Sequence, residues 1–490
     1  MVETDELTVQ EKRLVECARL GSWWEPETEN GEEPDMNPAK AENWSADRTL
    51  RAAVIRCLMT GETWPGEMGP WPVGCKGVMV KGAFVSGALD LEGVCVSRTL
   101  RLRSCAFDGR VSLMDAETKT VVLSGSFLPE GLDAQGAKIK GDLRLRDGFM
   151  VKGEVNLTRA TIEGQLVCDG GCFQNPGGEA IDLTLASIGS GLFLWKLRRE
   201  KDQRGLDGRL VLSQARCRTY TDDRESWPEQ GKLVLDGFTY ERFHDCATDW
   251  KTRRDWLQRQ AAVHLDDSFH PQPWTQAVKV LREMGHDRDA RELAMQREIA
   301  HAGSKGTRWP MRLWLWFLRL TIGSGYKPHL ALFWSLGFVL FGWLVFAGAA
   351  NLGFMVPRDG AVQSAMAAAH GPLLQHYPRF NAPVYALDNF LPVTELGQDA
   401  AWVPSDEQAG QRRITQDGMF AETARLLLGH DRTVTGKAAA RPADTGGLAA
   451  PSVWLFRHGF HRFVYWAQEL LGWVFISLLI AGMSGLVKRE

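Results

Sequence analysis

The stretch IKGDLRLRDGFMVKGEVNLTRATIEGQLVC, from Ile139 to Cys168, holds three copies of one short pattern. In each copy an apolar residue is followed two positions later by glycine, and two further apolar residues then alternate with other residue types. Six of the eight copies in the chain keep the glycine, and Arg98 and Ser190 replace it in the other two. Neighbouring copies often begin eleven or twelve residues apart. They are Val85–Leu91, Val96–Leu102, Phe107–Leu113, Ile139–Leu145, Val151–Leu157, Ile162–Cys168, Ile188–Leu194 and Leu206–Leu212.

This repeat predicts a β-solenoid over residues 79–243. Alternation with a period of two turns every second side chain inward, and glycine permits a corner between strands. A single unit buries too little surface, so stability must come from stacked neighbours. We expect a right-handed parallel β-helix with two units in each coil of about 22 residues. A β-sandwich of short strands is the alternative, but its hairpin turns would not repeat one glycine position so often.

Helical segments flank the repeat. Residues 1–78 are expected to form an N-terminal helical cap, in which Asp47–Gly61 has the apolar spacing of a helix. Residues 244–304 are expected to form a helical hairpin region. Within it, Trp274–Ala300 predicts two short helices hinged at Gly285 and His286, and one such pair is too little for a peptide-binding array.

Two apolar stretches near the C-terminal end, residues 328–357 and 463–487, are each long enough to cross a membrane. A hydrocarbon core of about 30 Å needs about 20 helical residues. A pair of buried core helices is the alternative. Basic residues precede the first stretch and follow the second, so the positive-inside rule predicts that both chain ends lie in the cytoplasm. Residues 358–462 would then form an extracytoplasmic loop.

A third apolar segment, residues 305–326, is expected to lie in the membrane interface. Arg308, Arg312 and Arg319 fall on one stripe of a helix, while Trp309, Trp316 and their neighbours cover the remainder. Such a helix places guanidinium groups on lipid phosphates. The lipid bilayer is therefore an expected partner.

Cysteine and histidine are unevenly distributed along the chain. No histidine precedes His244 and no cysteine follows Cys246, which excludes local Cys/His zinc modules apart from that isolated pair. The nine cysteines suit a reducing compartment, and Cys168 and Cys172 are interpreted as buried structural thiols. A net charge of −3 gives no basic field for nucleic acid. With no nucleotide fingerprint either, no catalytic, cofactor-binding or metal-binding residue is assigned.

Acidic residues provide weaker candidates. Asp90, Asp142 and Glu154 are interpreted as solvated residues of the solenoid surface, in preference to carboxylates of a polysaccharide enzyme. Glu469, about two turns inside the second apolar stretch, is either a functional intramembrane acid or the partner of Arg358 or Arg462.

The loop contains one segment, Asn381–Pro404, that is expected to be structured. Its apolar patch, with Asp388 beside it, would rest on the outer leaflet or dip between the membrane helices. In the second apolar stretch, Ser477, Ala481 and Gly485 recur every four residues and permit close helix packing. The packing partner would be the first membrane helix (at Gly337 or Gly342) or a second copy of the chain.

This order of parts resembles a family of bacterial proteins often named membrane-associated oxidoreductases. Besides the repeat, the blocks that carry the resemblance are Pro271–Leu293, Gly323–Trp334, Val384–Trp402 and Leu470–Arg489. The resemblance implies a bacterial cytoplasmic membrane and redox activity, but it brings no catalytic residues to this chain.

Taken together, these features predict a non-enzymatic, membrane-tethered interaction or signalling scaffold with a protein partner on the solenoid face. An oligomeric channel or membrane-perturbing effector gated by the solenoid is the second hypothesis. The third is the oxidoreductase that the family name implies.

Overall fold

The computed structural model describes residues 6–27, 34–66, 69–198, 205–267, 269–304, 309–323, 329–369, 377–391, 394–405, 456 and 458–483. The chain divides into two compact units, Met1–Arg312 and Leu313–Glu490. The first unit contains the repeat, and the second contains the apolar stretches.

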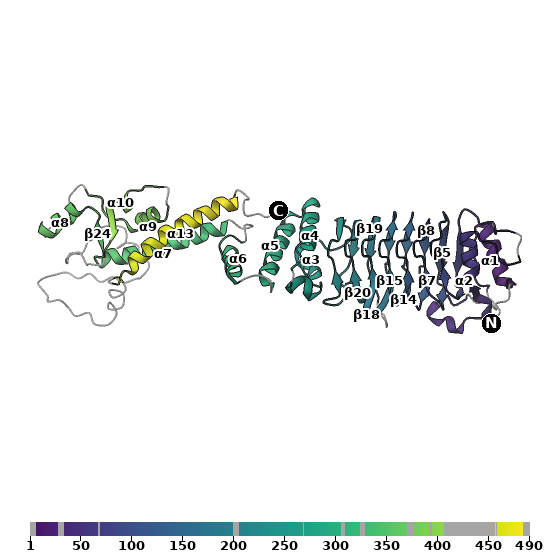
Figure 1. Cartoon of the computed structure of the whole chain (residues 1–490). Coiled ribbons are helices and arrows are strands. Elements are labelled where there is room, and N and C mark those ends of the chain that lie inside the picture. Colours follow the sequence, from purple (N-terminus) through teal and green to yellow (C-terminus); the bar gives the residue numbers. More distant parts are fainter. Residues whose placement is uncertain are drawn as a thin grey trace. The chain divides into compact units, whose positions relative to one another are not determined.

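The repeat folds into a parallel β-solenoid of about seven turns, which confirms the predicted fold class. Successive turns pair in register: Leu100 lies between Val78 and Val121, and Leu143 lies between Val121 and Leu166. These partners are about 22 residues apart along the chain, as two eleven-residue units per coil require. Figure 1 shows the stacked strands in the first unit.

Each turn contributes short strands to two sheets, of 12 and 11 strands. The first sheet contains β1 (Thr49–Arg51), β3 (Phe84–Ser86), β6 (Ala106–Phe107), β10 (Phe127–Leu128), β14 (Met150–Lys152), β18 (Cys172–Asp182), β15 (Val155–Asn156), β11 (Leu132–Asp133), β7 (Val111–Ser112), β4 (Leu89–Asp90), β20 (Asp207–Val211) and β22 (Leu233–Val234). The second contains β2 (Val78–Lys81), β5 (Thr99–Arg103), β9 (Thr120–Val122), β13 (Leu143–Arg144), β17 (Leu166–Val167), β19 (Ser187–Leu194), β16 (Thr161–Ile162), β12 (Lys138–Ile139), β8 (Glu117–Thr118), β21 (Arg216–Asp222) and β23 (Thr239–Phe243).

The apolar positions of the repeat fill the solenoid interior. Leu143, Leu166 and Leu192 stack on one another and have no exposed surface. The motif glycine serves close stacking as well as chain reversal, because a Cβ on Gly164 would lie 2.7 Å from the backbone oxygen of Gly141 in the preceding turn. A larger residue at Gly164 would therefore push adjacent turns apart.

One corner of the solenoid is built from polar side chains that accept a hydrogen bond from the backbone N–H two residues later. The donor–acceptor distances lie between 2.8 and 3.5 Å, and such turns are favoured by Asp, Asn and Ser. The residues are Asp90, Ser112, Asp133, Asn156 and Asp182, which occupy one register position in successive turns.

Helices close the N-terminal end of the solenoid. They are α1 (Val9–Leu20), the 3₁₀ turns η1 (Pro38–Asn43) and η2 (Ala46–Arg48), and α2 (Ala52–Thr60). The predicted helix over Asp47–Gly61 begins only at Ala52, because Thr49–Arg51 pairs with β3 as strand β1. Glu11 of α1 is almost fully buried and forms an ion pair with Arg51 at 2.7 Å.

The other end is closed by α3 (Trp250–Leu257), the π-helical turn η4 (Val263–Asp267), α4 (Gln272–Glu283) and α5 (Asp287–Gly303). The predicted hinge between α4 and α5 is confirmed, since Gly285 adopts a left-handed φ of 83°. Leu233 forms a β-bridge with Gln260, so the chain after α3 continues the last turn of the stack.

Helix α6 (Trp309–Ile322) begins in the last residues of the first unit and continues into the second. The second unit also contains α7 (His329–Asn351), β24 (Met355–Pro357), α8 (Gly360–Ala369), α9 (Ala382–Phe390), α10 (Gln398–Ala401), β25 (Trp402–Pro404) and α13 (Phe460–Met483). Among the described residues, α7 and Phe460–Ala481 are long and apolar enough to cross a membrane. α7 ends six residues before the predicted boundary, because Gly353 turns left-handed and β24 then pairs with β25. α9 packs against both long helices (Figure 1).

Candidate functional site

A second corner of the solenoid runs through Ser104, Gly125, Asp147 and Gly170, all with left-handed φ. The backbone N–H of each donates to a carbonyl of the next turn at 2.9–3.0 Å. The column ends differently at Lys196, whose N–H donates to the Asp223 carboxylate at 2.8 Å. The Asp223 carboxylate thus accepts the hydrogen bond that a backbone carbonyl of the next turn accepts elsewhere in the column. The corner is left open beside Trp195.

A hollow of about 430 Å³ lies at this open corner. Asp147, Gly148, Asp169, Gly170, Trp195 and Lys196 line it. In the described part of the chain nothing lies within 4 Å of a Cβ atom added to Gly148 or Gly170. Trp195 is 36% exposed, so part of its ring faces the hollow.

The hollow contains one uncompensated acceptor. Asp169 Oδ1 is buried and has no hydrogen-bond partner among the described residues. Burial raises the pKa of Asp169, although a hydrogen bond from the Trp195 backbone and the charges of Arg146 and Lys196 oppose the rise. Asp147, in contrast, already accepts from Arg146 Nε at 2.8 Å. Asp169 is therefore the carboxylate that a bound donor would stabilise.

Cations also surround the hollow. Lys196 Nζ lies 4.3 Å from the centre of the Trp195 ring, a cation–π contact, and Arg198 completes the lining. The hollow thus combines an aromatic face, a carboxylate without a donor on one oxygen, and a flexible lysine.

A second hollow of about 260 Å³ adjoins the first and shares Trp195 with it. Its lining includes Arg253 and Asp222, both almost completely buried and joined by an ion pair at 2.9 Å. Trp227 Nε1 also donates to Asp222, at 2.8 Å, and Arg253 Nε donates to Ala247 O, at 2.6 Å. All charged groups of this pair are satisfied inside the chain.

Aromatic rings surround the buried arginine. The Arg253 guanidinium lies 4.0 Å from the Phe243 ring centre and 5.7 Å from that of Trp256. Burial alone would lower the pKa of Arg253, but the Asp222 charge raises it. This cluster packs α3 onto the last turn of the solenoid, and its role is structural.

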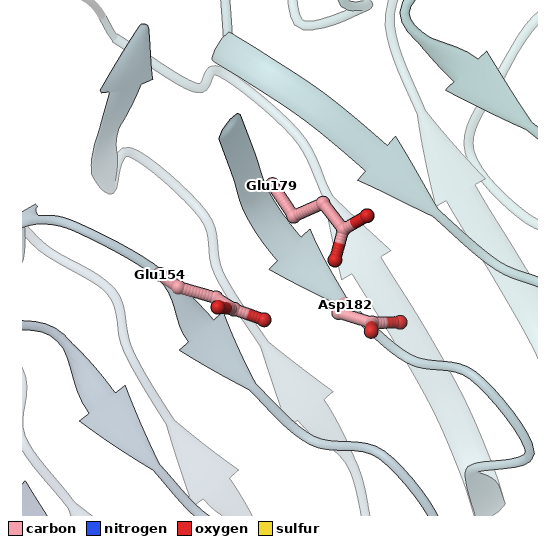
Figure 2. A group of neighbouring side chains, drawn as sticks. All are labelled: Glu154, Glu179 and Asp182. Atoms are coloured by element: carbon pink, nitrogen blue, oxygen red, sulfur yellow. The ribbon is translucent and has the colours of Figure 1, made fainter. Parts of the chain in front are cut away.

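Three acidic side chains, Glu154, Glu179 and Asp182, meet on the first sheet (Figure 2). One oxygen of each lies within 4.8 Å of the others, a spacing that could hold a metal ion. Asp182 already accepts from the Thr184 and Thr158 hydroxyls. Glu179 pairs with Arg209 at 2.6 Å. Burial, and then the charge of Glu179, raise the pKa of Glu154, which the sequence identifies only as a solvated surface acid.

The segment that was predicted to lie in the membrane interface forms the helix α6. Trp309 and Trp316 are 76% and 60% exposed, and Arg319 is exposed as well. Arg308 and the side chain of Arg312 lie outside the described residues, so the arginine stripe is described at Arg319 alone. These exposed tryptophans, with Leu313 and Leu320, give α6 a large apolar surface among the described residues.

The two acidic candidates of the second unit occupy different surroundings. Asp388 is 8% exposed and accepts three backbone hydrogen bonds at 2.7–2.9 Å, from Leu396, Gln398 and Asp399, so it ties residues 396–399 to α9. Glu469 is exposed. Among the described residues neither predicted partner pairs with it, because Arg358 donates to Asp399 O and Arg462 lies over Trp466.

The residues of α13 that pack against α7 are not those predicted from the four-residue spacing of small residues. Ser477 is exposed and Ala481 is half-buried, whereas Phe475 is buried against Phe338 of α7. Gly485 lies outside the described residues. Of the two glycines predicted on α7, Gly342 faces α13, since a Cβ there would clash with the side-chain amide of Gln468, and Gly337 is exposed.

Sequence reasoning missed the polar residues between these helices. Gln468 is buried and donates to Phe338 O at 3.0 Å, while Asn389 of α9 donates to Gln468 Oε1 at 3.2 Å. The sequence carries a signal for these contacts, because Asn389 and Gln468 are amide side chains within otherwise apolar helices.

The hollow at Trp195 was missed as well, although the chain carries a signal for it. Asp-Gly pairs at 147–148 and 169–170 recur one coil apart, and Trp195-Lys196 takes the corresponding place in the next coil. No protein-family model, curated protein or solved structure matches this chain. The resemblance to membrane-associated oxidoreductases therefore stays a prediction.

Proposed function

We propose that this chain is a membrane-tethered scaffold whose solenoid binds a protein partner through its lateral surface. The observation that supports this proposal is that helices cover both ends of the solenoid. Its sides are therefore the surface left for recognition. Two helices suited to a membrane follow in the same chain and would hold this surface at the bilayer.

We further propose the bacterial cytoplasmic membrane, with the solenoid and both chain ends in the cytoplasm. The basic residues before α7 and after α13 support this orientation. The cysteines support it too, since all nine are free thiols and all lie in the first unit. α6 would lie along the same leaflet and place its exposed tryptophans in the interface.

The proposal is tested by photo-crosslinking in the native host. A photoreactive residue is placed singly at Asp90, Arg103, Lys138 and Lys152, which are exposed and lie on four different strand columns. We expect one discrete protein to crosslink from one or two neighbouring columns. A full-length, membrane-bound chain that crosslinks from none of the four would contradict the scaffold.

The purified chain provides a second measurement. A stoichiometric flavin, haem or metal in its absorption or elemental spectrum would favour the oxidoreductase over the scaffold.

A further inference from the structure

The hollow beside Trp195 points to the chemistry of the partner that the scaffold recognises. We propose that a partner protein inserts a basic side chain, arginine above all, between Trp195 and Asp169, from an extended segment that follows the corner. This inference rests on the proposed function and specifies one site on the lateral surface.

The first argument is the unmet hydrogen-bonding capacity of Asp169. A buried carboxylate oxygen without a donor costs free energy, and a cationic N–H donor satisfies it best. Among the described residues nothing lies within 4 Å of a Cβ position on Gly148 or Gly170, so the corner has free space beside Asp169, and a turn of its carboxylate would present the buried oxygen to an incoming donor.

The second argument is that a cation already occupies the aromatic face. Lys196 holds its ammonium 4.3 Å from the Trp195 ring centre. A lysine stem is flexible, and an incoming guanidinium can take its place, because the planar group both stacks on the ring and donates to a carboxylate.

A third argument comes from the chain itself, which binds an arginine in the same manner next to the hollow. Asp222 accepts two hydrogen bonds from Arg253, at 2.9 and 3.1 Å, and Phe243 stacks on the guanidinium. Asp169 and Trp195 line one hollow and offer a carboxylate and an aromatic ring at the surface, with Lys196 as the cation on the ring.

The dimensions fit an extended peptide. Asp147, Asp169, Trp195 and Asp223 lie on successive turns. Parallel strands are about 4.8 Å apart, so the corner runs for about 14 Å, the length of about four extended residues. The second hollow continues the path beyond Trp195.

The test uses the full chain in lipid nanodiscs and a displayed library of random heptapeptides, with prior depletion on empty nanodiscs. We expect the selected peptides to share an arginine, and replacement of that arginine by glutamine to weaken binding about tenfold. Asp169→Asn should weaken the original peptide equally but leave the glutamine peptide unchanged.

Three further variants discriminate between mechanisms. Gly170→Asn, whose residue tolerates left-handed φ, should fill the hollow and weaken binding. Lys196→Gln should strengthen binding several-fold, because it removes a competing cation. Asp90→Asn, on another corner, is the matched control and should leave the affinity unchanged.

Selected peptides without a basic residue, or insensitive to Asp169→Asn and Gly170→Asn, would overturn this assignment while the scaffold stands. Binding of oligosaccharides on a glycan array, lost in Trp195→Ala, would make the hollow a sugar site instead. Absence of crosslinks from all four columns is the separate result that would reject the scaffold itself.

Discussion

Arg253 is a charged side chain with almost no exposure to water, and its compensation comes from Asp222, the Ala247 carbonyl and the ring of Phe243. Breaking a buried pair leaves a charge without a partner. The end of the solenoid therefore depends on this one side chain more than on its many surface ion pairs.

Arg253→Met should destabilise the solenoid unit by about 3–5 kcal/mol, because it leaves the buried Asp222 carboxylate without its cationic partner. Thermal unfolding followed by the β-sheet circular dichroism signal measures the loss. Arg209→Met, which breaks an ion pair whose arginine is half exposed, is the control and should cost less than about 1 kcal/mol. Equal losses in the two variants would contradict the assigned importance of burial.

Glu11 gives the N-terminal cap a pH dependence. Burial alone would raise its pKa, but hydrogen bonds from Arg51 and the Thr8 backbone outweigh burial and hold the pKa below its usual value. A depressed folded pKa means that the stabilisation is present above the unfolded value of about 4.3 and is lost as pH falls through the folded one.

Glu11→Gln should consequently weaken the cap by about 2 kcal/mol at neutral pH and by much less in acid. Hydrogen exchange of the α1 and β1 amides reads this local stability directly. A difference between the two proteins that stays constant down to the acid range would show that the carboxylate charge is not the cause.

Among the elements, the strands are the least able to form alone. Many contain only two residues, such as β7 and β15, and they persist because each is hydrogen-bonded to strands in the turns before and after it. The glycine motif predicts this stacking, since its spacing repeats once per half coil. It does not predict where each short strand ends, because corner geometry depends on neighbouring turns.

The recurring Asp-Gly pairs mark the corner in the sequence, but the exposure of Trp195 there could not be predicted, for a related reason. Trp195 is prominent only because the Asp223 side chain takes the place of a backbone turn next to it, and that substitution is long-range. Helix packing shows the same limit: the four-residue spacing of Ser477 and Ala481 suggests a contact face, but Gln468 and Phe475 make the contacts with α7.

α9 approaches α13 so closely that one glycine is required. A Cβ on Gly472 would lie in steric conflict with the Phe390 backbone oxygen, whereas one on Gly337 of α7 would meet nothing within 4 Å. Gly472→Ala should therefore lower the thermal stability of the second unit by several degrees, and Gly337→Ala should not. Thermal unfolding of the two variants in detergent, followed by the helical circular dichroism signal, compares their midpoints. Equal unfolding midpoints would contradict the close packing of α9.

For the molecule as a whole, the exposed cysteines Cys75 and Cys95 report the proposed orientation. A membrane-impermeant maleimide should leave both unlabelled in intact cells and label them after permeabilisation. A cysteine introduced at exposed Glu395 should be labelled in intact cells.

Cys105 is the internal control. Burial raises its pKa to about 12, and only the thiolate reacts, so it should stay unlabelled until the chain is denatured. Labelling of Cys75 in intact cells would place the solenoid outside and reverse the topology.

The register between turns also has a consequence for how such a chain changes over generations. Each turn is hydrogen-bonded to the turns before and after it, and the caps contact the terminal turns. A duplication or deletion of one whole coil would therefore lengthen or shorten the stack by about 4.8 Å and leave both caps intact. The number of coils encoded in the sequence thus sets the distance between the two helical caps. Over generations this distance can change by one coil at a time.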